Sequence, residues 1–122
     1  MTDVDTTVAA LRDRAVAFRD ERDWRQFHTP KDLTLAIAAE AGELAEVFLW
    51  KTPEEVEEAL ADPEQRWRLS EEMADVLLYL LCLADVTGVD LSQAVEAKLA
   101  VNAARYPVER SRGSARKYTD LT

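Results

Sequence analysis

The chain has 122 residues, of which 48% are hydrophobic and 32% are charged, and its formal net charge is −9. This size and composition indicate one globular domain with a sizeable core and argue against a disordered chain. The negative charge argues against a nucleic-acid binder, which needs a basic patch. The most apolar run, residues 76–84, is too short to span a bilayer. The single cysteine excludes an internal disulfide and, with a polar N-terminus, predicts a cytoplasmic protein that does not engage a membrane.

Residues that favour helix dominate the sequence, which contains only 3 glycines and 4 prolines. The sequence therefore predicts an all-α fold. A first helix is expected to begin after Thr6 or Thr7, which can cap it, and to run to about Asp23. Its apolar residues follow the i, i+3, i+4 spacing of one buried stripe. The stripe consists of Val8, Leu11, Ala15 and Phe18.

An aromatic loop is expected over residues 24–30, because Pro30 disfavours helix in the residue before it. A second helix is expected over residues 31–50. Its apolar side chains surround the helix axis, so burial on several sides is expected. Residues 51–63 form the next connection, which the sequence predicts to be either a short acidic helix or a mobile segment.

A long third helix is expected over residues 64–87, with Gly88 as its C-cap signal. A fourth is expected from Leu91 to Pro107, and a basic tail follows. The apolar faces of the second and third helices exceed what four short helices can bury, so a homo-oligomer is expected. The predicted architecture is a bundle of four to five helices, with a domain over residues 1–110 and a tail over 111–122.

Two pairs of carboxylates interrupt the apolar helices: Glu40 with Glu43, and Glu72 with Asp75. Residues three apart on a helix lie on one face, so each pair directs two oxygen ligands the same way. Clustered carboxylates repel one another unless a counter-charge is present. Mg²⁺ is the natural counter-charge, because it prefers oxygen ligands and substrate phosphates. The pairs therefore predict a divalent metal site, although a solvated helix face would produce the same spacing.

The same four acids resemble the signature of a known family. Glu40-x-x-Glu43, 28 intervening residues and Glu72-x-x-Asp75 are similar to the motif of the all-α nucleoside triphosphate pyrophosphohydrolases, the MazG-like superfamily. Within it, the chain most resembles the dCTP pyrophosphatase branch. The blocks that carry this resemblance are residues 21–28, 42–52, 71–80 and 114–119.

The resemblance implies a MazG-like bundle assembled as a homotetramer, a dimer of dimers. It also implies Mg²⁺-dependent hydrolysis of dCTP to dCMP and pyrophosphate, with Mn²⁺ as a substitute metal and 5-modified dCTP as a further candidate substrate. Glu40, Glu43, Glu72 and Asp75 would be the catalytic metal ligands. One acid of the first pair, with Glu40 preferred, would instead position the attacking water.

Further residues are expected to bind the nucleotide. Lys98 and Asn102 would contact phosphate or sugar, because they interrupt an apolar helix face one turn apart, and Tyr106 would pack on the deoxyribose. Tyr79 follows Asp75 by one turn and would face the same pocket. The remaining expectations are an aromatic slot for the base and a phosphate clamp in the tail. They involve Trp24, His28, Trp50, Arg116 and Lys117.

The sequence leaves alternatives open for several of these residues. Lys98 and Asn102 also suit a snorkelling lysine and a helix end, and Tyr79 suits core packing. Aromatic residues at helix ends often belong to a core or an interface. For the whole chain, the alternatives are a pyrophosphohydrolase with another base preference, such as dUTP or oxidised nucleotides, and a non-catalytic helical oligomer that binds nucleotides.

Overall fold

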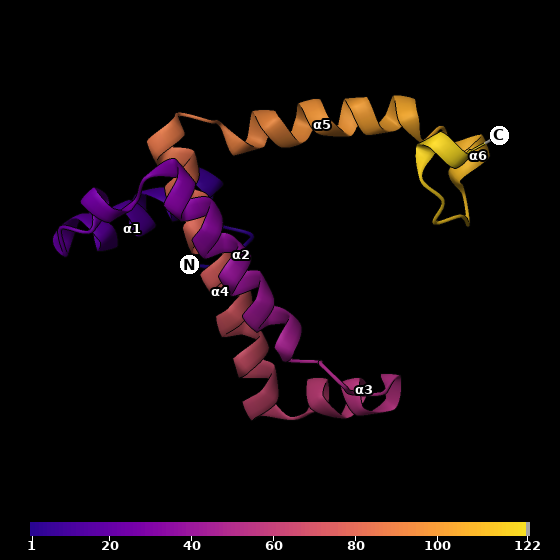
Figure 1. Cartoon of the computed structure of the whole chain (residues 1–122), viewed down its shortest axis with the longest axis horizontal. Coiled ribbons are helices and arrows are strands. Elements are labelled where there is room, and N and C mark those ends of the chain that lie inside the picture. Colours follow the sequence, from indigo (N-terminus) through magenta and orange to yellow (C-terminus); the bar gives the residue numbers. More distant parts are fainter. Residues whose placement is uncertain (122) are drawn as a thin grey trace. The chain divides into compact units, whose positions relative to one another are not determined.

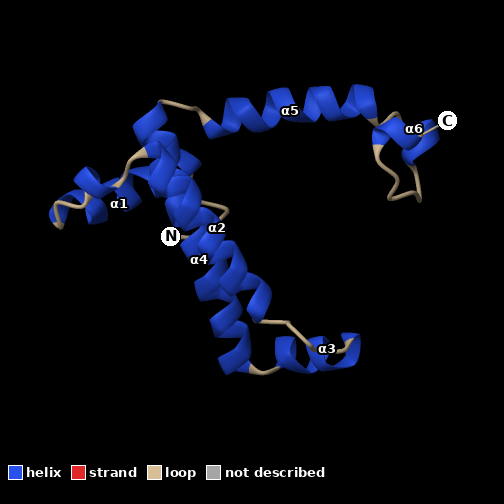
Figure 2. Ribbon diagram, viewed as in Figure 1, coloured by secondary structure: helices blue, strands red, loops and turns tan. Residues whose placement is uncertain are grey.

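The computed structural model describes residues 1–121 as helices joined by short connections (Figure 1). Figure 2 shows helices and loops, and residues 1–121 contain no strand, which confirms the all-α prediction. The chain divides into two compact units, Met1–Gly88 and a second unit that begins at Val89. Within the described residues, no helix combines the length and the apolar character needed to cross a membrane.

The first unit is organised around one long helix. α2 lies along α4, and α1 and α3 each pack on α4 as well (Figure 1). This arrangement brings the two carboxylate pairs, one on α2 and one on α4, onto neighbouring helices. The elements in chain order are α1 (Val8–Glu21), the 3-10 turn η1 (Arg25–Phe27), α2 (Pro30–Glu46), α3 (Pro53–Ala61) and α4 (Pro63–Thr87).

The helices of this unit begin where the sequence supplies capping side chains. The hydroxyl groups of Thr7, Thr29 and Thr52 accept backbone N–H groups in the first turns of α1, α2 and α3. Thr52 forms a full capping box with Glu55. α3 is therefore a defined helix, which decides between the short helix and the mobile segment that the sequence allowed. Gly88 ends α4 in the left-handed conformation, with φ of 73°, as predicted.

The prediction that the second helix continues to residue 50 is wrong. α2 ends at Glu46, and the next four residues form turns in which backbone N–H groups bond three residues back instead of four. Trp50 has a φ of 63°, in the left-handed region. A non-glycine residue in this region cannot continue a right-handed helix, so the chain turns here toward α3.

The buried core is smaller than the sequence predicts. Phe18 is 53% exposed and Val8 is 43% exposed, so the expected buried stripe of α1 is wrong at both ends. α2 and α4 each cover only one side of the other, and the remaining sides leave Leu35 and Leu77 exposed. Burial of α2 on several sides is therefore not achieved within one chain. The buried apolar residues are Ala15, Leu33, Val47, Ala59, Leu81, Cys82 and Ala84.

The second unit consists of α5 (Leu91–Arg105), α6 (Val108–Ser111) and a 3-10 turn, η2 (Tyr118–Asp120). The Asp90 side chain caps α5. In the tail, Tyr118 packs edge-on against Tyr106, with ring centroids 5.9 Å apart, and the Arg105 guanidinium lies 4.7 Å from the Tyr118 ring centre. The tail therefore folds back on the end of α5. A boundary at residue 110 stays a prediction.

Candidate active site

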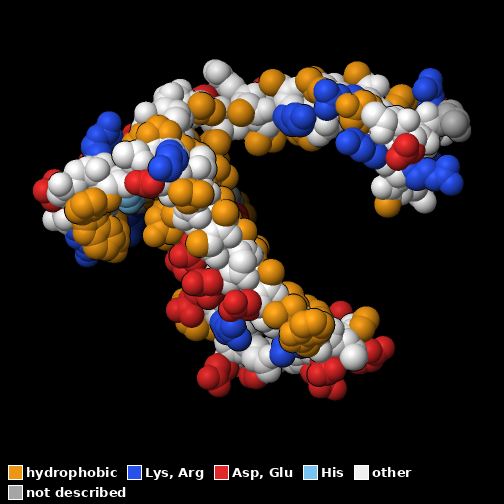
Figure 3. Space-filling model, in the orientation of Figure 1, with side chains coloured by type: hydrophobic (Ala, Val, Ile, Leu, Met, Phe, Trp, Pro, Cys, Tyr) orange, Lys and Arg blue, Asp and Glu red, His pale blue; other side chains and the backbone are white. Residues whose placement is uncertain are grey.

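Three of the four predicted acids come together between α2 and α4. Glu40, Glu43 and Glu72 each offer a carboxylate oxygen, and these oxygens lie within 4.8 Å of one another. Asp75 is outside this group but lines a cavity together with Glu40. On the face shown in Figure 3, acidic side chains gather over α2 and α4. The helices thus hold a carboxylate cluster of the kind that the spacing predicts.

The cluster is electrostatically unfavourable without a positive charge. Oε2 of Glu40 and Oε2 of Glu72 are both buried and have no hydrogen-bond partner. Burial raises the pKa of Glu40 above its ordinary value, and the negative charges of Glu43, Asp75 and Glu72 raise it further. The pKa of Glu72 is raised by burial first and then by the charges of Glu43 and Asp75.

Divalent metal binding would relieve this situation. Unpaired buried carboxylate oxygens are costly, and a cation supplies the missing partner for several of them at once. Carboxylate oxygens are also the ligands that Mg²⁺ and similar hard cations prefer. The cluster of Glu40, Glu43 and Glu72 could therefore hold a metal ion.

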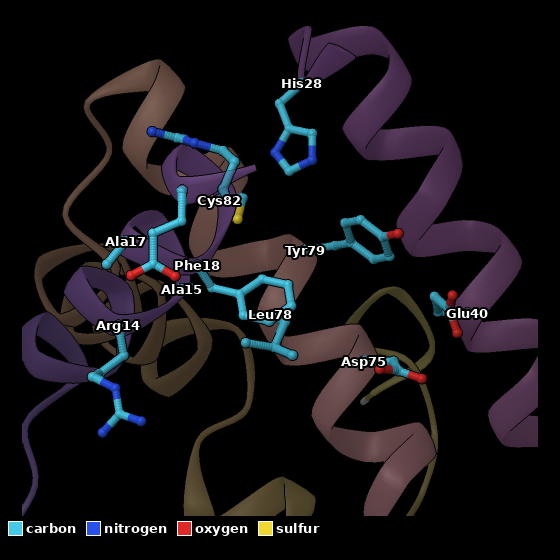
Figure 4. Close-up of a pocket in the computed structure, with 12 residues that line it drawn as sticks. Arg14, Ala15, Ala17, Phe18, His28, Glu40, Asp75, Leu78, Tyr79 and Cys82 are labelled. Carbon is cyan, nitrogen blue, oxygen red and sulfur yellow. The ribbon is translucent and has the colours of Figure 1, made fainter. Parts of the chain in front are cut away.

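A cavity of about 560 Å³ adjoins the cluster (Figure 4). Glu40 and Asp75 line it on the side of the acids, and His28 and Tyr79 line it further along. In Figure 4 the rings of His28 and Tyr79 face the same space, and the ring centroids are 6.3 Å apart. Four residues that the sequence assigned separately to metal and to nucleotide therefore share one cavity.

His28 presents a polar atom without a partner. Its Nδ1 is buried and makes no hydrogen bond. Burial lowers the pKa of His28 below its ordinary value, and the positive charge of Arg19 lowers it further. The imidazole is therefore neutral near pH 7, with one nitrogen free to donate or accept a hydrogen bond.

Some cavity residues were not recognised as site residues from the sequence. Phe18 of α1 was assigned to the core stripe, but its exposed ring lines the cavity, where the Arg22 guanidinium covers it at 3.6 Å. Leu78 and Cys82 of α4 line the cavity too. The sequence carries one signal for them, because Leu78 follows Asp75 by three residues and Cys82 follows Tyr79 by three. Each therefore shares a helix face with a residue that the sequence assigned to the site.

The two predicted base-stacking tryptophans do not line this cavity within the described residues. Trp24 packs edge-on against Phe18 at 5.9 Å and is 45% exposed. Trp50 is 91% exposed at the turn after α2. Both indoles are accessible, and their role in base binding stays a prediction.

The other predicted nucleotide contacts belong to the second unit. Lys98 is exposed on α5, whereas Asn102 and Tyr106 are half-buried at its end. Arg116 and Lys117 are exposed in the tail, where the Ser114 hydroxyl accepts the backbone N–H of Arg116. Their part in a substrate site stays a prediction.

Comparisons with known proteins show which proteins the chain resembles. The model of the MazG-like family matches residues 35–121. The dCTP pyrophosphatase 1 of Bos taurus is 50% identical to the chain over 115 residues, which cover 94% of the chain and 68% of the relative. The dCTP pyrophosphatase 1 of Homo sapiens is 47% identical over the same length, with the same coverage.

A solved structure is also similar. It is a pyrophosphatase from Archaeoglobus fulgidus DSM 4304, with a TM-score of 0.76 and 37% sequence identity. The match covers 88% of this chain and 98% of that chain. The residues that the family model matches include all four acids.

Proposed function

The chain belongs to the MazG-like family, and we propose that it is a nucleoside triphosphate pyrophosphohydrolase that converts dCTP to dCMP and pyrophosphate. The observation that carries this proposal is the cluster of Glu40, Glu43 and Glu72, of which Glu40 also lines a cavity of about 560 Å³. The dCTP pyrophosphatases at 47–50% identity support cytosine as the base. Removal of dCTP or 5-modified dCTP from the nucleotide pool would be its role.

The metal in this proposal is Mg²⁺, with Mn²⁺ as a substitute. Glu40, Glu43, Glu72 and Asp75 would hold it, since three of them already meet within 4.8 Å and Asp75 lies on the same cavity. Bound there, the cation would neutralise the triphosphate and the charge that develops during phosphoryl transfer. Burial and mutual repulsion raise the pKa values of Glu40 and Glu72, and a bound cation would offset both effects.

Hydrolysis requires that a water oxygen bond to the α-phosphorus while the bond from that phosphorus to the bridging oxygen of pyrophosphate breaks. The water must lose a proton, which a carboxylate can accept. Glu40 is our candidate for positioning this water, because its buried Oε2 has no protein partner and the residue lines the cavity. The reaction needs no covalent nucleophile on the protein.

The nucleoside would occupy the cavity beside the acids. Tyr79 and His28 face this space, and the free Nδ1 of His28 suits a hydrogen bond to the base. Trp24 and Trp50 would stack on the base from the turns that carry them. Stacking on an aromatic ring contributes about 1–3 kcal/mol per base in nucleic-acid binding proteins. Loss of either indole should therefore weaken substrate binding measurably.

The second unit would contribute to the phosphates and the sugar. Lys98 is an exposed point charge suited to phosphate. Asn102 would bind phosphate or sugar, and Tyr106 would pack on the deoxyribose. Arg116 and Lys117 of the tail would close over the phosphates as a clamp. Each of these five residues can be replaced by alanine and KM for dCTP measured. A raised KM would identify a residue that binds substrate, and an unchanged KM would exclude that residue from the site.

We assign the active form to a homotetramer built as a dimer of dimers. Large apolar side chains of both units are exposed in the single chain, and a neighbouring copy would cover them. Light scattering should give four times the chain mass of 13.8 kDa, whereas a monomer would contradict this assembly. The exposed residues include Leu35, Met73, Leu77, Leu80, Val95 and Leu99.

The place of action in this proposal is the cytoplasm, without a nucleic-acid or membrane partner. The buried, unpaired thiol of Cys82 suits a reducing compartment. The chain's net charge of −9 would repel nucleic acid. A fluorescent fusion that concentrates in another compartment would contradict this part.

The direct test is pyrophosphate release from a panel of canonical and 5-modified deoxynucleotides and ribonucleotides, with and without Mg²⁺. We expect Mg²⁺-dependent release that is strongest for cytosine deoxynucleotides. Release without a cytosine preference would keep the enzyme class and overturn the base assignment. Nucleotide binding without any release would identify a non-catalytic binding protein instead.

A further inference from the structure

An ion-pair network built on the buried Arg19 adjoins the cavity and joins α1 and η1 to α4. The Arg19 side chain is only 2% exposed, and its Nη1 donates to Oδ2 of Asp85 at 2.8 Å. Its Nε donates to Oδ1 of Asp20 at 2.9 Å. Nη1 of Arg25 lies 3.3 Å from the same Oδ2 of Asp85. One carboxylate oxygen on α4 therefore binds two arginines from different elements.

Stability alone does not account for a network of this kind. Arg25 is 60% exposed and Asp85 27% exposed, so water screens their contact and it contributes little stability. Arg19 is buried, and its charge loses hydration that its two ion pairs must offset. What an ion pair adds is a fixed geometry, since charged hydrogen bonds are short and directional. The effect of the network on function therefore depends on which segment it holds in place.

The segment that it fixes is the connection between α1 and α2. η1 contains no buried residue, and Phe27 is 64% exposed, so apolar packing does little to hold it. The Arg25–Asp85 contact links η1 to α4 through side chains. The backbone N–H of Trp24 donates to the Arg19 carbonyl at 3.1 Å, which ties the start of the segment to the same arginine. His28 follows η1 directly as its C-cap.

This connection carries the residues that would recognise the base. His28 lines the cavity opposite Tyr79, and Trp24 packs on Phe18 beside it. Arg19 and Cys82, the latter almost one turn before Asp85 on α4, line the same cavity. The network thus lies between the body of the unit and the base-recognition segment.

We propose that Asp85 is a positioning residue for nucleotide recognition, which acts through Arg19 and Arg25 to hold the Trp24–His28 segment against the cavity. The inference rests on the proposed function. It predicts that loss of the Arg25 contact weakens substrate binding while the carboxylate chemistry continues. Asp85 itself does not touch the reacting atoms in this scheme.

The decisive variant is Arg25→Ala, because it releases the segment and leaves the buried Arg19–Asp85 pair intact. We expect KM for dCTP to rise about threefold, the size typical of one partly exposed ion pair, with kcat unchanged within about twofold. Asp85→Asn should raise KM by about tenfold, because it weakens both arginine contacts. Arg25→Lys should restore part of the loss. Arg12→Ala is the matched control, since it removes a half-buried arginine whose ion pair, within residues 1–121, is with its neighbour Asp13 on α1.

A second readout does not depend on activity. His28 is the only histidine of the chain, so its ring Hε1 proton gives one resolvable NMR signal in the nucleotide-free protein. Arg25→Ala should shift or broaden that signal, and Arg12→Ala should not. An unchanged signal and an unchanged KM in Arg25→Ala would overturn the inference. If the unmodified protein releases no pyrophosphate, the proposed function fails, and the NMR signal still tests the tether.

Discussion

The acids of the candidate site lie on regular helices, whereas the two tryptophans proposed to stack on the base lie on turns. Glu40, Glu43 and Glu72 lie on α2 and α4, where helix spacing and helix packing set their positions. Trp24 and Trp50 lie at the ends of helices, and Trp50 takes a left-handed φ of 63°. The acids gather without help from another segment, while the indoles remain exposed.

This difference separates reaction from recognition. A metal site needs several ligands held in one geometry, which two packed helices provide. A base-binding slot needs walls that can close on a ligand. Moving a turn costs less free energy than moving a packed helix. We therefore propose that the helices hold the reacting groups and that the turns set the base preference. Variants in one region should leave the function of the other unchanged.

The largest effect is expected from Glu43→Gln. Removing one charged ligand from the cluster should lower kcat/KM by at least about a hundredfold, because the cation would be held weakly and misplaced. The assembly should be unchanged, since glutamine has nearly the same size and shape as glutamate. Glu57→Gln on α3 is the matched control and should keep full activity. Retained turnover in Glu43→Gln would disprove its role as a ligand.

Metal removal should act through the same region. Chelation with EDTA should abolish pyrophosphate release, and added Mg²⁺ should restore it. Mg²⁺ should also raise Tm, because it binds the folded carboxylate cluster and relieves its repulsion. Differential scanning fluorimetry checks this, with Glu43→Gln expected to lose most of the rise. Full activity in excess EDTA would contradict the metal assignment.

Trp50 tests the recognition region. Trp50→Ala should raise KM for dCTP several-fold and flatten the preference among bases, because base stacking contributes about 1–3 kcal/mol. kcat should change little. A base profile identical to that of the unmodified protein would remove Trp50 from the binding slot.

Trp50→Gly separates the indole from the backbone. Both variants lose the same side chain, but glycine adopts the left-handed conformation freely whereas an L-residue pays about 1–2 kcal/mol for it. Trp50→Gly should therefore show a higher Tm than Trp50→Ala with a similar KM. Equal stability of the two variants would mean that the strain is not present in solution.

The smallest effect concerns His28. Because burial and the charge of Arg19 lower its pKa below the ordinary value of 6.5, the unfolded chain takes up a proton at higher pH than the folded chain. The contribution of His28 to stability is thus present above pH 6.5 and is lost as the pH falls through the lowered value. An NMR titration should give a midpoint below 6.5, and a midpoint above it would contradict the buried position.

The sequence was a good guide to most of the helices and to the clustering of three acids, for a physical reason. Helix spacing is local, so Glu40 and Glu43 had to share a face once the helix formed, and the caps at Thr7 and Gly88 fixed helix ends. The end of α2 was missed because the left-handed Trp50 carries no glycine signal. Phe18 was assigned to the core because periodicity cannot distinguish a cavity wall from a packed interior.

The network around Asp85 could not be read from the sequence for a different reason. Asp85 and Arg19 are 66 residues apart, and nothing local marks either as paired. Such long-range contacts depend on how α1 packs on α4, which follows from the fold as a whole. Which arginine and which aspartate form an ion pair is therefore known only after the helices have been placed.

The central claim, that the helical acids carry out cleavage between the α- and β-phosphates, is tested most directly by ³¹P NMR of dCTP incubated with the protein and Mg²⁺. The account predicts that the triphosphate signals give way to those of dCMP and pyrophosphate, and that Glu43→Gln leaves dCTP intact. Formation of dCDP and inorganic phosphate, or unchanged dCTP with the unmodified protein, would contradict it.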